Sequence, residues 1–144
     1  MDIRHEIKIN SPADVVYRAL TTSEGIGGWW TPDNRIDPGI GSVAEFNFGH
    51  RYHNRMEITG LYENKRVTWY CLQGDEEWVG TDFSFELGEK NGLTTLKFGH
   101  NNWRKKTGFF ESCSIQWAKY MQSLKSYCEK GKGQPYGSNP GAIK

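Results

Sequence analysis

The C-terminal part of the chain carries the strongest structural signal, because its apolar residues recur at intervals of three and four. This spacing places them on one face of an α-helix that runs from about residue 106 to residue 130. At 1.5 Å per residue, about 24 helical residues reach roughly 36 Å, enough to cross a whole sheet in a domain of this size. The residues on the apolar face are Phe110, Cys113, Trp117, Tyr120, Met121, Leu124 and Cys128.

Residues 32–100 alternate between apolar and polar side chains and are interrupted by Gly-, Pro-, Asn- and Asp-rich turns. This pattern predicts an antiparallel meander. An earlier alternation over residues 2–9, with Ile3, Ile7 and Ile9 on one parity, predicts a first strand. The expected meander strands are residues 43–48, 53–60, 66–72, 80–88 and 93–99.

Two short helices are expected between the first strand and the meander. Ser11 is a suitable N-cap, Pro12 suits the first helical position, and together they predict a helix that ends near Thr21. Residues 24–30 can add one more turn, although their three glycines favour a bend over a long helix.

The order of these elements predicts a single α+β domain over residues 1–130. Strongly twisted sheets of six to seven strands tend to curl, so the long helix is expected to cover the concave face. Residues 131–144 are rich in glycine and proline and have no periodicity. They are expected to form a mobile or loosely packed tail.

Charge and cysteine content narrow the range of partners. The 18 Lys and Arg against 17 Asp and Glu give a formal charge of +1, which attracts neither nucleic acid nor an anionic membrane. No apolar stretch approaches the roughly 20 residues of a membrane span. Three cysteines without a CxxC pattern indicate reduced thiols. We therefore expect a cytoplasmic protein with no nucleic-acid partner and no membrane insertion.

Aromatic residues are abundant relative to aliphatic ones. Hydrophobic residues are only 36% of the chain, yet Phe, Trp and Tyr alone are 14%. Large rings fill wide spaces and line pockets well, which suggests an enclosed cavity.

Several segments, taken in order, resemble the START-like helix-grip (SRPBCC) superfamily, and within it the family named for the C-terminal domain of the activator of heat-shock-protein-90 ATPase. The resemblance covers about residues 1–136 and departs from the usual glycines at 39–42, 102 and 116. The matching segments are INSPADVVYRALT with Trp29 and Trp30, DPGIGSVAEFNF, NKRVTWY, GTDFSFEL, TTLKFGHNNW and IQWAKYMQSLKSYCEKGKGQPY.

The resemblance implies a curved antiparallel sheet wrapped around a long C-terminal helix, with a pocket between them. A lipid-like or other small apolar ligand is the usual occupant. The family implies no shared catalytic set, and its name suggests a chaperone partner and a role in the stress response. The candidate ligand contacts are Trp117, Tyr120, Met121 and Leu124 on the helix and Trp69, Phe83, Phe85 and Phe98 on the sheet, although for each one alone a core position is favoured over a ligand contact.

His100 ends a strand on the same parity as Leu96 and Phe98. Its imidazole is therefore expected either to point into the cavity, as a ligand contact or proton carrier, or to bond the backbone or water at the strand end.

Arg55 and Glu57 share the parity opposite Met56 and Ile58. If the two apolar residues face the core, the charged pair is solvated, because burying charges is costly. In the other register, Arg55 would meet a ligand carboxylate.

Metal, cofactor and nucleophile signals are weak. His50 and His53 flank a turn, but no carboxylate or cysteine stands nearby at a ligand spacing. There is no G-x-S-x-G, P-loop or dinucleotide fingerprint, and Cys113 and Cys128 fall on the apolar helix face. We expect no metal and no cofactor, and assign no catalytic residue.

These observations favour binding of a small hydrophobic or aromatic molecule between the sheet and the long helix, by a monomer or homodimer. One alternative is a cyclase- or hydrolase-like enzyme that uses His100 as general base. Another is a chaperone-associated protein-binding module.

Overall fold

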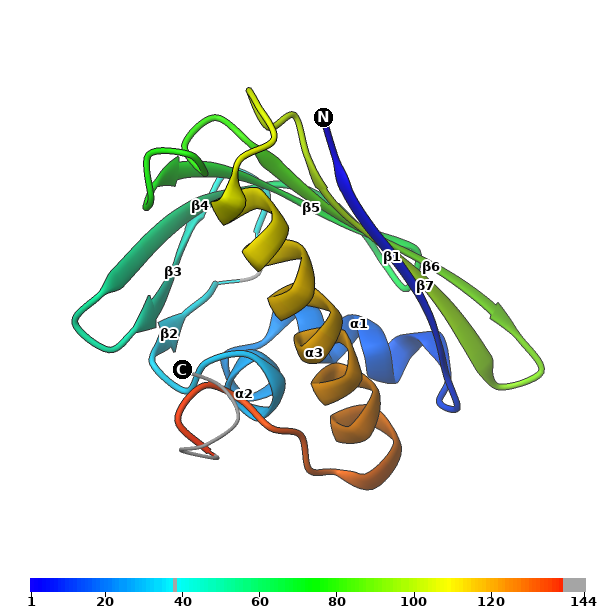
Figure 1. Cartoon of the computed structure of the whole chain (residues 1–144). Helices are drawn as coiled ribbons and strands as arrows, with labels where there is room; N and C mark the ends of the chain where they lie inside the picture. Colours follow the sequence, from blue (N-terminus) through cyan, green and yellow to red (C-terminus); the bar gives the residue numbers. More distant parts are fainter. Residues whose placement is uncertain (38, 139–144) are drawn as a thin grey trace.

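A seven-stranded antiparallel sheet and three helices form the computed structural model, which describes residues 1–37 and 39–138. The strands lie in the order β1-β7-β6-β5-β4-β3-β2. Figure 1 shows the longest helix, α3, lying across the curved sheet, with α1 and α2 beside its C-terminal half. The strand bounds are β1 Ile3–Ile9, β2 Asn34–Arg35, β3 Val43–Phe48, β4 Tyr52–Tyr62, β5 Arg66–Gln73, β6 Asp82–Lys90 and β7 Leu93–Asn101.

Alternation along the strands places one parity against the helices. On β6, Phe83, Phe85 and Leu87 are buried, and they pair across the ladder with β7 residues of the same face. The predicted α+β sheet with a long C-terminal helix is confirmed. Strand β2 was not predicted, because two residues carry no periodicity.

Helix α1 spans Ala13–Thr21, and its start differs from the prediction. Pro12, not Ser11, occupies the N-cap, with no side-chain capping bond. The Ser11 hydroxyl instead donates to the carbonyl of Cys128, at 3.0 Å, and so ties the end of β1 to α3. A bond to a distant segment cannot be read from local capping rules.

Helix α2 spans Ser23–Trp29 and is a true helix despite its glycines. The Thr22 hydroxyl caps it by accepting from the Gly25 amide at 3.0 Å. The Trp29 indole donates to the Ala19 carbonyl at 2.8 Å, which joins α2 to α1. Tertiary contacts thus offset the low helix propensity of glycine.

Gly25→Ala is expected to destabilise the protein, because α2 crosses α1 closely at this point. A Cβ on Gly25 would lie 2.6 Å from the Cα of Ala19, in a backbone that cannot easily move. A Cβ on Gly27, by contrast, would lie 3.6 Å from its nearest neighbouring atom, which is an ordinary contact. Alanine at this position also has the higher helix propensity. Urea unfolding should show a loss of about 1–3 kcal/mol for Gly25→Ala and none for Gly27→Ala. Equal effects would contradict the close crossing.

Helix α3 spans Gly108–Lys130. The Thr107 hydroxyl caps it by accepting from the Phe110 amide, and Gly131 ends it in the left-handed region, with φ 77°. Among the described residues, no helix is both long and apolar enough to cross a membrane. The buried residues of α3 are Phe110, Cys113, Trp117, Tyr120, Met121, Ser123 and Leu124.

Residues 131–138 fold back onto the domain. The Gln134 amide donates to the Ser123 hydroxyl, and the Tyr136 amide donates to the Trp30 carbonyl, both at 2.7 Å. The Tyr136 ring packs edge-on against Phe48. This part of the tail is therefore held by specific contacts that its composition does not indicate. Residues 139–144 of the predicted mobile tail lie outside the described residues.

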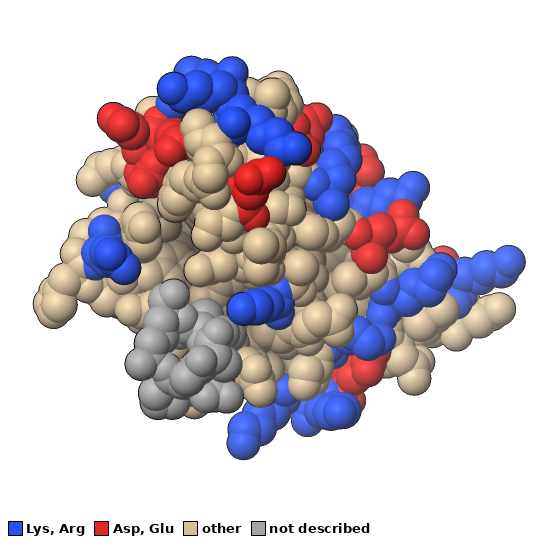
Figure 2. All heavy atoms as spheres, viewed as in Figure 1, with Lys and Arg blue, Asp and Glu red and all other residues tan. Residues whose placement is uncertain are grey.

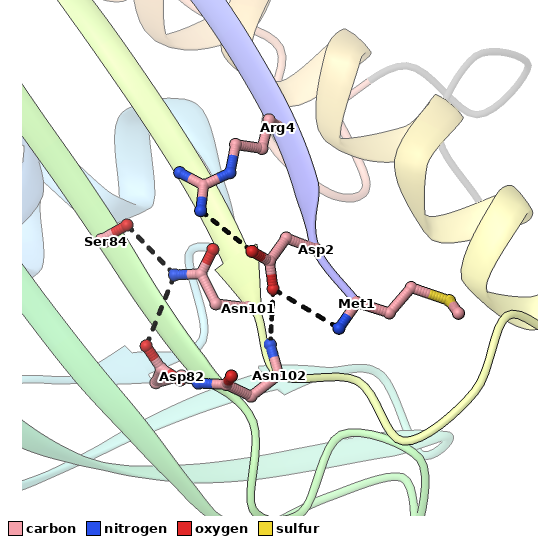
Figure 3. Close-up of polar contacts among 7 residues, drawn as sticks. All are labelled: Met1, Asp2, Arg4, Asp82, Ser84, Asn101 and Asn102. Atoms are coloured by element: carbon pink, nitrogen blue, oxygen red, sulfur yellow. Dashed lines mark hydrogen bonds and ion pairs between the residues drawn. The ribbon is translucent and has the colours of Figure 1, made fainter.

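A polar network joins the start of β1 to the start of β6 and the end of β7 (Figure 3). The Asp2 carboxylate accepts from the Asn102 amide and from the Arg4 guanidinium, both at 2.9 Å. The bond from the Asn102 amide is the main cause that lowers the pKa of Asp2. Asn102 has φ 68°, which asparagine tolerates well. The network holds the edge strand in register.

Candidate functional site

A cavity of about 630 Å³ lies between the first half of α3, the β3–β4 hairpin and the β5–β6 loop. Tyr136 and Gly137 close one side of it. Figure 2 shows the surface between α3 and the β3–β4 side as hollowed and poor in charge. Eight aromatic side chains line the cavity: Trp30, Phe48, Tyr52, Trp78, Phe109, Trp117, Tyr120 and Tyr136.

Charged and polar side chains at the cavity are few. Arg51, on the β3–β4 turn, is exposed and makes no ion pair within residues 1–37 and 39–138. Asp75, on the β5–β6 loop, accepts from the Glu77 amide at 2.8 Å. Ser112 and Gln116 are exposed on α3. Arg51 is therefore the cation available to an anionic group on a ligand.

Two hydrogen-bonding side chains lie deeper in the cavity wall. Asn54, on β4, is only 2% exposed, and Tyr120, on α3, is only 5% exposed. Neither side chain makes a hydrogen bond to any described residue. Burial raises the pKa of the Tyr120 hydroxyl, so it keeps its proton at neutral pH.

His100 is fully buried and does not line the cavity. The Trp117 indole N–H donates to its Nδ1 at 3.2 Å, so this nitrogen carries no proton. The Nε2–H then donates to the Thr81 hydroxyl at 2.8 Å, which donates in turn to the Trp78 carbonyl at 2.6 Å. Burial lowers the pKa of His100 to about 3. The imidazole is neutral and has both nitrogens bound by protein groups.

The structure divides the predicted ligand contacts into two groups. Trp117 and Tyr120 line the cavity. The core holds the others, which do not line it: Trp69, Phe83, Phe85, Phe98, Met121 and Leu124.

Arg55 lies on the outer face of the sheet. Met56 and Ile58 are buried, and Arg55 is exposed opposite Glu45 of β3. The register is thus the one that solvates Arg55, so its guanidinium does not reach the cavity.

The thiols of the chain are poor nucleophiles. Cys113 lines the cavity, but burial raises the pKa of its thiol to about 11. Burial likewise raises the pKa of Cys71 to about 11 and that of Cys128 to about 12. Within the part of the chain that the structure describes, no three His, Cys, Asp or Glu side chains are grouped to hold a metal ion.

Sequence reasoning missed Arg51, Asn54, Asp75 and Tyr136. Asn54 carried a usable signal, because it shares the parity of Met56 and Ile58 and therefore faces inward. Arg51, Asp75 and Tyr136 stand in turns or the tail, where no periodicity shows the direction of a side chain.

Comparison with known proteins places the chain in a family. The family model described as "Activator of Hsp90 ATPase homolog 1-like protein" matches residues 10–129. No significant match was found among curated proteins.

Solved structures of similar fold cover nearly the whole chain. The solution structure of the Aha1 dimer from Colwellia psychrerythraea is 37% identical, with a TM-score of 0.83, over 92% of this chain and 99% of that one. Protein MLL2253 from Mesorhizobium loti is 18% identical, with a TM-score of 0.78, over 88% and 95%. DynU16, a protein of the dynemicin biosynthetic locus, is 20% identical, with a TM-score of 0.75, over 92% and 48%. The latter two show the shared fold alone.

Proposed function

The chain belongs to the family of activator of Hsp90 ATPase homologue 1-like proteins, which has ligand-binding and polyketide-cyclase-like members, and on this premise we propose that it binds a small hydrophobic or aromatic molecule in the cavity. The observation that carries the proposal is the aromatic lining of a cavity of about 630 Å³. Ligand pockets commonly measure about 300–1,000 Å³ and have mostly apolar walls with a few polar groups.

The charged groups at the cavity suggest how such a ligand is oriented. Its apolar body packs between Trp30, Trp117 and Phe109, while Arg51 is available to an anionic or carbonyl group. In this proposal Arg51 takes the role that the sequence suggested for Arg55, because it stands on the turn that borders the cavity.

Filling the cavity is expected to weaken ligand binding. Ser112 lines it and is exposed on α3, so Ser112→Phe places a ring where the ligand would lie. The affinity should fall at least about tenfold, since the lost apolar contact is worth more than about 1.4 kcal/mol. Tryptophan-fluorescence titration with a panel of aromatic acids, aromatic ketones and fatty acids measures the affinity, and native mass spectrometry of the fresh protein detects a retained ligand.

Ile115→Phe is the matched control, because Ile115 is exposed on the same helix but does not line the cavity. It should bind as the wild type does. Unchanged binding by Ser112→Phe would place the ligand elsewhere, and no binding across the panel would refute the proposal.

The sequence is also compatible with two other roles. An enzyme with His100 as general base gains no support, since both imidazole nitrogens are bound within the protein. A chaperone partner rests on the family name, and an unchanged chaperone ATPase rate on mixing would remove it.

A homodimer has a precedent in the Colwellia psychrerythraea relative, which is described as a dimer. We propose the same state for this chain, in the reducing cytoplasm that its three free cysteines suit. Sedimentation at a single monomer mass across protein concentrations would contradict the dimer.

A further inference from the structure

Asn54 is a polar side chain at the cavity that makes no hydrogen bond to a described residue. Its exposed fraction is 2%, it lines the cavity, and its amide makes no hydrogen bond to any residue of 1–37 or 39–138. The Asn54 amide oxygen and nitrogen are not among the fully buried side-chain atoms without a partner, so both keep some contact with the space of the cavity. A ligand that fills the cavity removes this contact, and an amide that is then left without a partner is costly. A polar group of the ligand is therefore the favoured partner of the amide.

The position of Asn54 is restricted by its surroundings. A Cβ on Gly74 would lie 2.4 Å from the Asn54 Oδ1, so the absence of a side chain on this β5–β6 loop residue makes room for the amide. On the other side, Asn54 pairs in the ladder with Phe46, which is buried in the core. The amide is thus held beside the cavity by the sheet and the loop.

Tyr120 presents a second polar group to the cavity, from the helix side. Its hydroxyl belongs to α3, whereas Asn54 belongs to the sheet, and both residues line the same cavity. Its side chain makes no hydrogen bond to any described residue. A ligand between sheet and helix therefore meets one polar group on each wall, with aromatic rings around both.

Resting on the proposed function, we propose that Asn54, with Tyr120, determines the specificity of the cavity for oxygenated aromatic molecules. Such a ligand carries a carbonyl or hydroxyl group on each of two edges, one for the Asn54 amide and one for the Tyr120 hydroxyl. A hydrocarbon or the alkyl chain of a lipid would leave both protein groups buried and unpaired, which disfavours its binding.

Two probes of similar shape test this specificity. The first is 6-acetyl-2-naphthol, which has a ketone and a hydroxyl at opposite ends of a flat bicycle. The second is 2-isopropyl-6-methylnaphthalene, which replaces both groups with alkyl groups. Dissociation constants are measured by tryptophan-fluorescence quenching for the wild type and for Asn54→Leu, Tyr120→Phe and Gln122→Leu. Gln122→Leu is the matched control, because this amide is exposed on α3 and does not line the cavity.

The wild type is expected to prefer the hydroxyketone at least about tenfold, because each unmade hydrogen bond to a buried group costs affinity. Asn54→Leu should remove most of the preference, Tyr120→Phe should reduce it, and Gln122→Leu should leave it within about twofold. Equal binding of both probes by the wild type, or an unchanged preference in Asn54→Leu, would overturn the role of Asn54 while leaving ligand binding intact. Binding of neither probe would overturn the proposed function and this inference together.

The thermal stability of the ligand-free protein is a second readout that needs no probe. Since the Asn54 amide makes no hydrogen bond to a described residue, leucine of similar shape removes no contact of the fold, and the Tm of Asn54→Leu should equal or exceed that of the wild type. A Tm lowered by several degrees would show that the amide serves the fold, and would overturn the proposal.

Discussion

Trp117→Ala is expected to lower the free energy of unfolding by about 3–5 kcal/mol, the range of a large buried ring reduced to a methyl group. The indole is buried between α3 and the sheet, with its centroid 4.5 Å from Phe98 and 5.2 Å from Trp30. Alanine would leave a void between the layers and would remove the N–H donor to His100. Urea unfolding at neutral pH, followed by far-UV circular dichroism, measures the loss.

Trp117→Phe separates packing from the hydrogen bond. Phenylalanine keeps a ring at this position but leaves the buried Nδ1 of His100 without its donor, so a loss of about 1–2 kcal/mol is expected. Tyr62→Ala is the control, because Tyr62 is 59% exposed, and it should change stability by about 0.5 kcal/mol or less. If Trp117→Ala lost no more stability than this control, packing of the indole between α3 and the sheet would not stabilise the fold.

Mild acid is expected to destabilise the protein through His100. The imidazole lies in a closed chain of donors and acceptors in which Trp117 donates to Nδ1 and Nε2 donates to Thr81. Protonation would set an N–H at Nδ1 against the N–H of Trp117, in a fully buried position. Desolvation accordingly lowers the pKa of His100 to about 3.

The direction of the pH effect follows from proton binding. An unfolded histidine has a pKa of about 6.5, so between this value and about 3 the unfolded chain binds a proton that the folded protein does not. The stabilisation that neutral His100 gives to the folded protein is fully present above pH 6.5 and is lost as the pH falls toward 3. One pH unit below the unfolded pKa corresponds to about 1.36 kcal/mol. The free energy of unfolding is therefore expected to fall by about 2 kcal/mol between pH 7 and pH 5.

Urea unfolding at pH 7 and pH 5 tests this dependence. His100→Gln keeps a donor and an acceptor but does not titrate, so its loss of stability over the same range should be much smaller than that of the wild type. His53→Asn is the control, because His53 is exposed and bonds only Asn47 among the described residues; it should keep the wild-type loss. If His100→Gln loses as much stability as the wild type between the two pH values, another group is responsible.

Most of the fold could be predicted, because burial and periodicity act locally. The apolar spacing of α3 and the alternation of β6 are repeated over many residues, so single exceptions do not hide them. The prediction that Ser11 caps α1 was wrong for the opposite reason, because the contact it makes is not local. Its hydroxyl bonds the Cys128 carbonyl, a partner that lies far along the chain. The helical state of α2 likewise depends on packing against α1.

The site was predicted in part. The parity of His100 correctly indicated that it faces inward, but its partners, Thr81 and Trp117, come from two other segments, and they occupy both nitrogens. Trp117 and Tyr120, which line the cavity, could be proposed from the sequence because they lie on the apolar face of α3. The position of Tyr136 was not predicted, since the return of the chain onto Trp30 depends on a backbone hydrogen bond that composition does not encode.

The indole N–H signals in a ¹H–¹⁵N correlation spectrum test the binding of an aromatic ligand in the cavity most directly. Of the six tryptophans, Trp30, Trp78 and Trp117 line the cavity, whereas Trp29, Trp69 and Trp103 do not. Titration with 6-acetyl-2-naphthol should shift the first three signals with one common dissociation constant and leave the others nearly unchanged. No saturable shift, or shifts confined to the second three, would contradict ligand binding in the cavity.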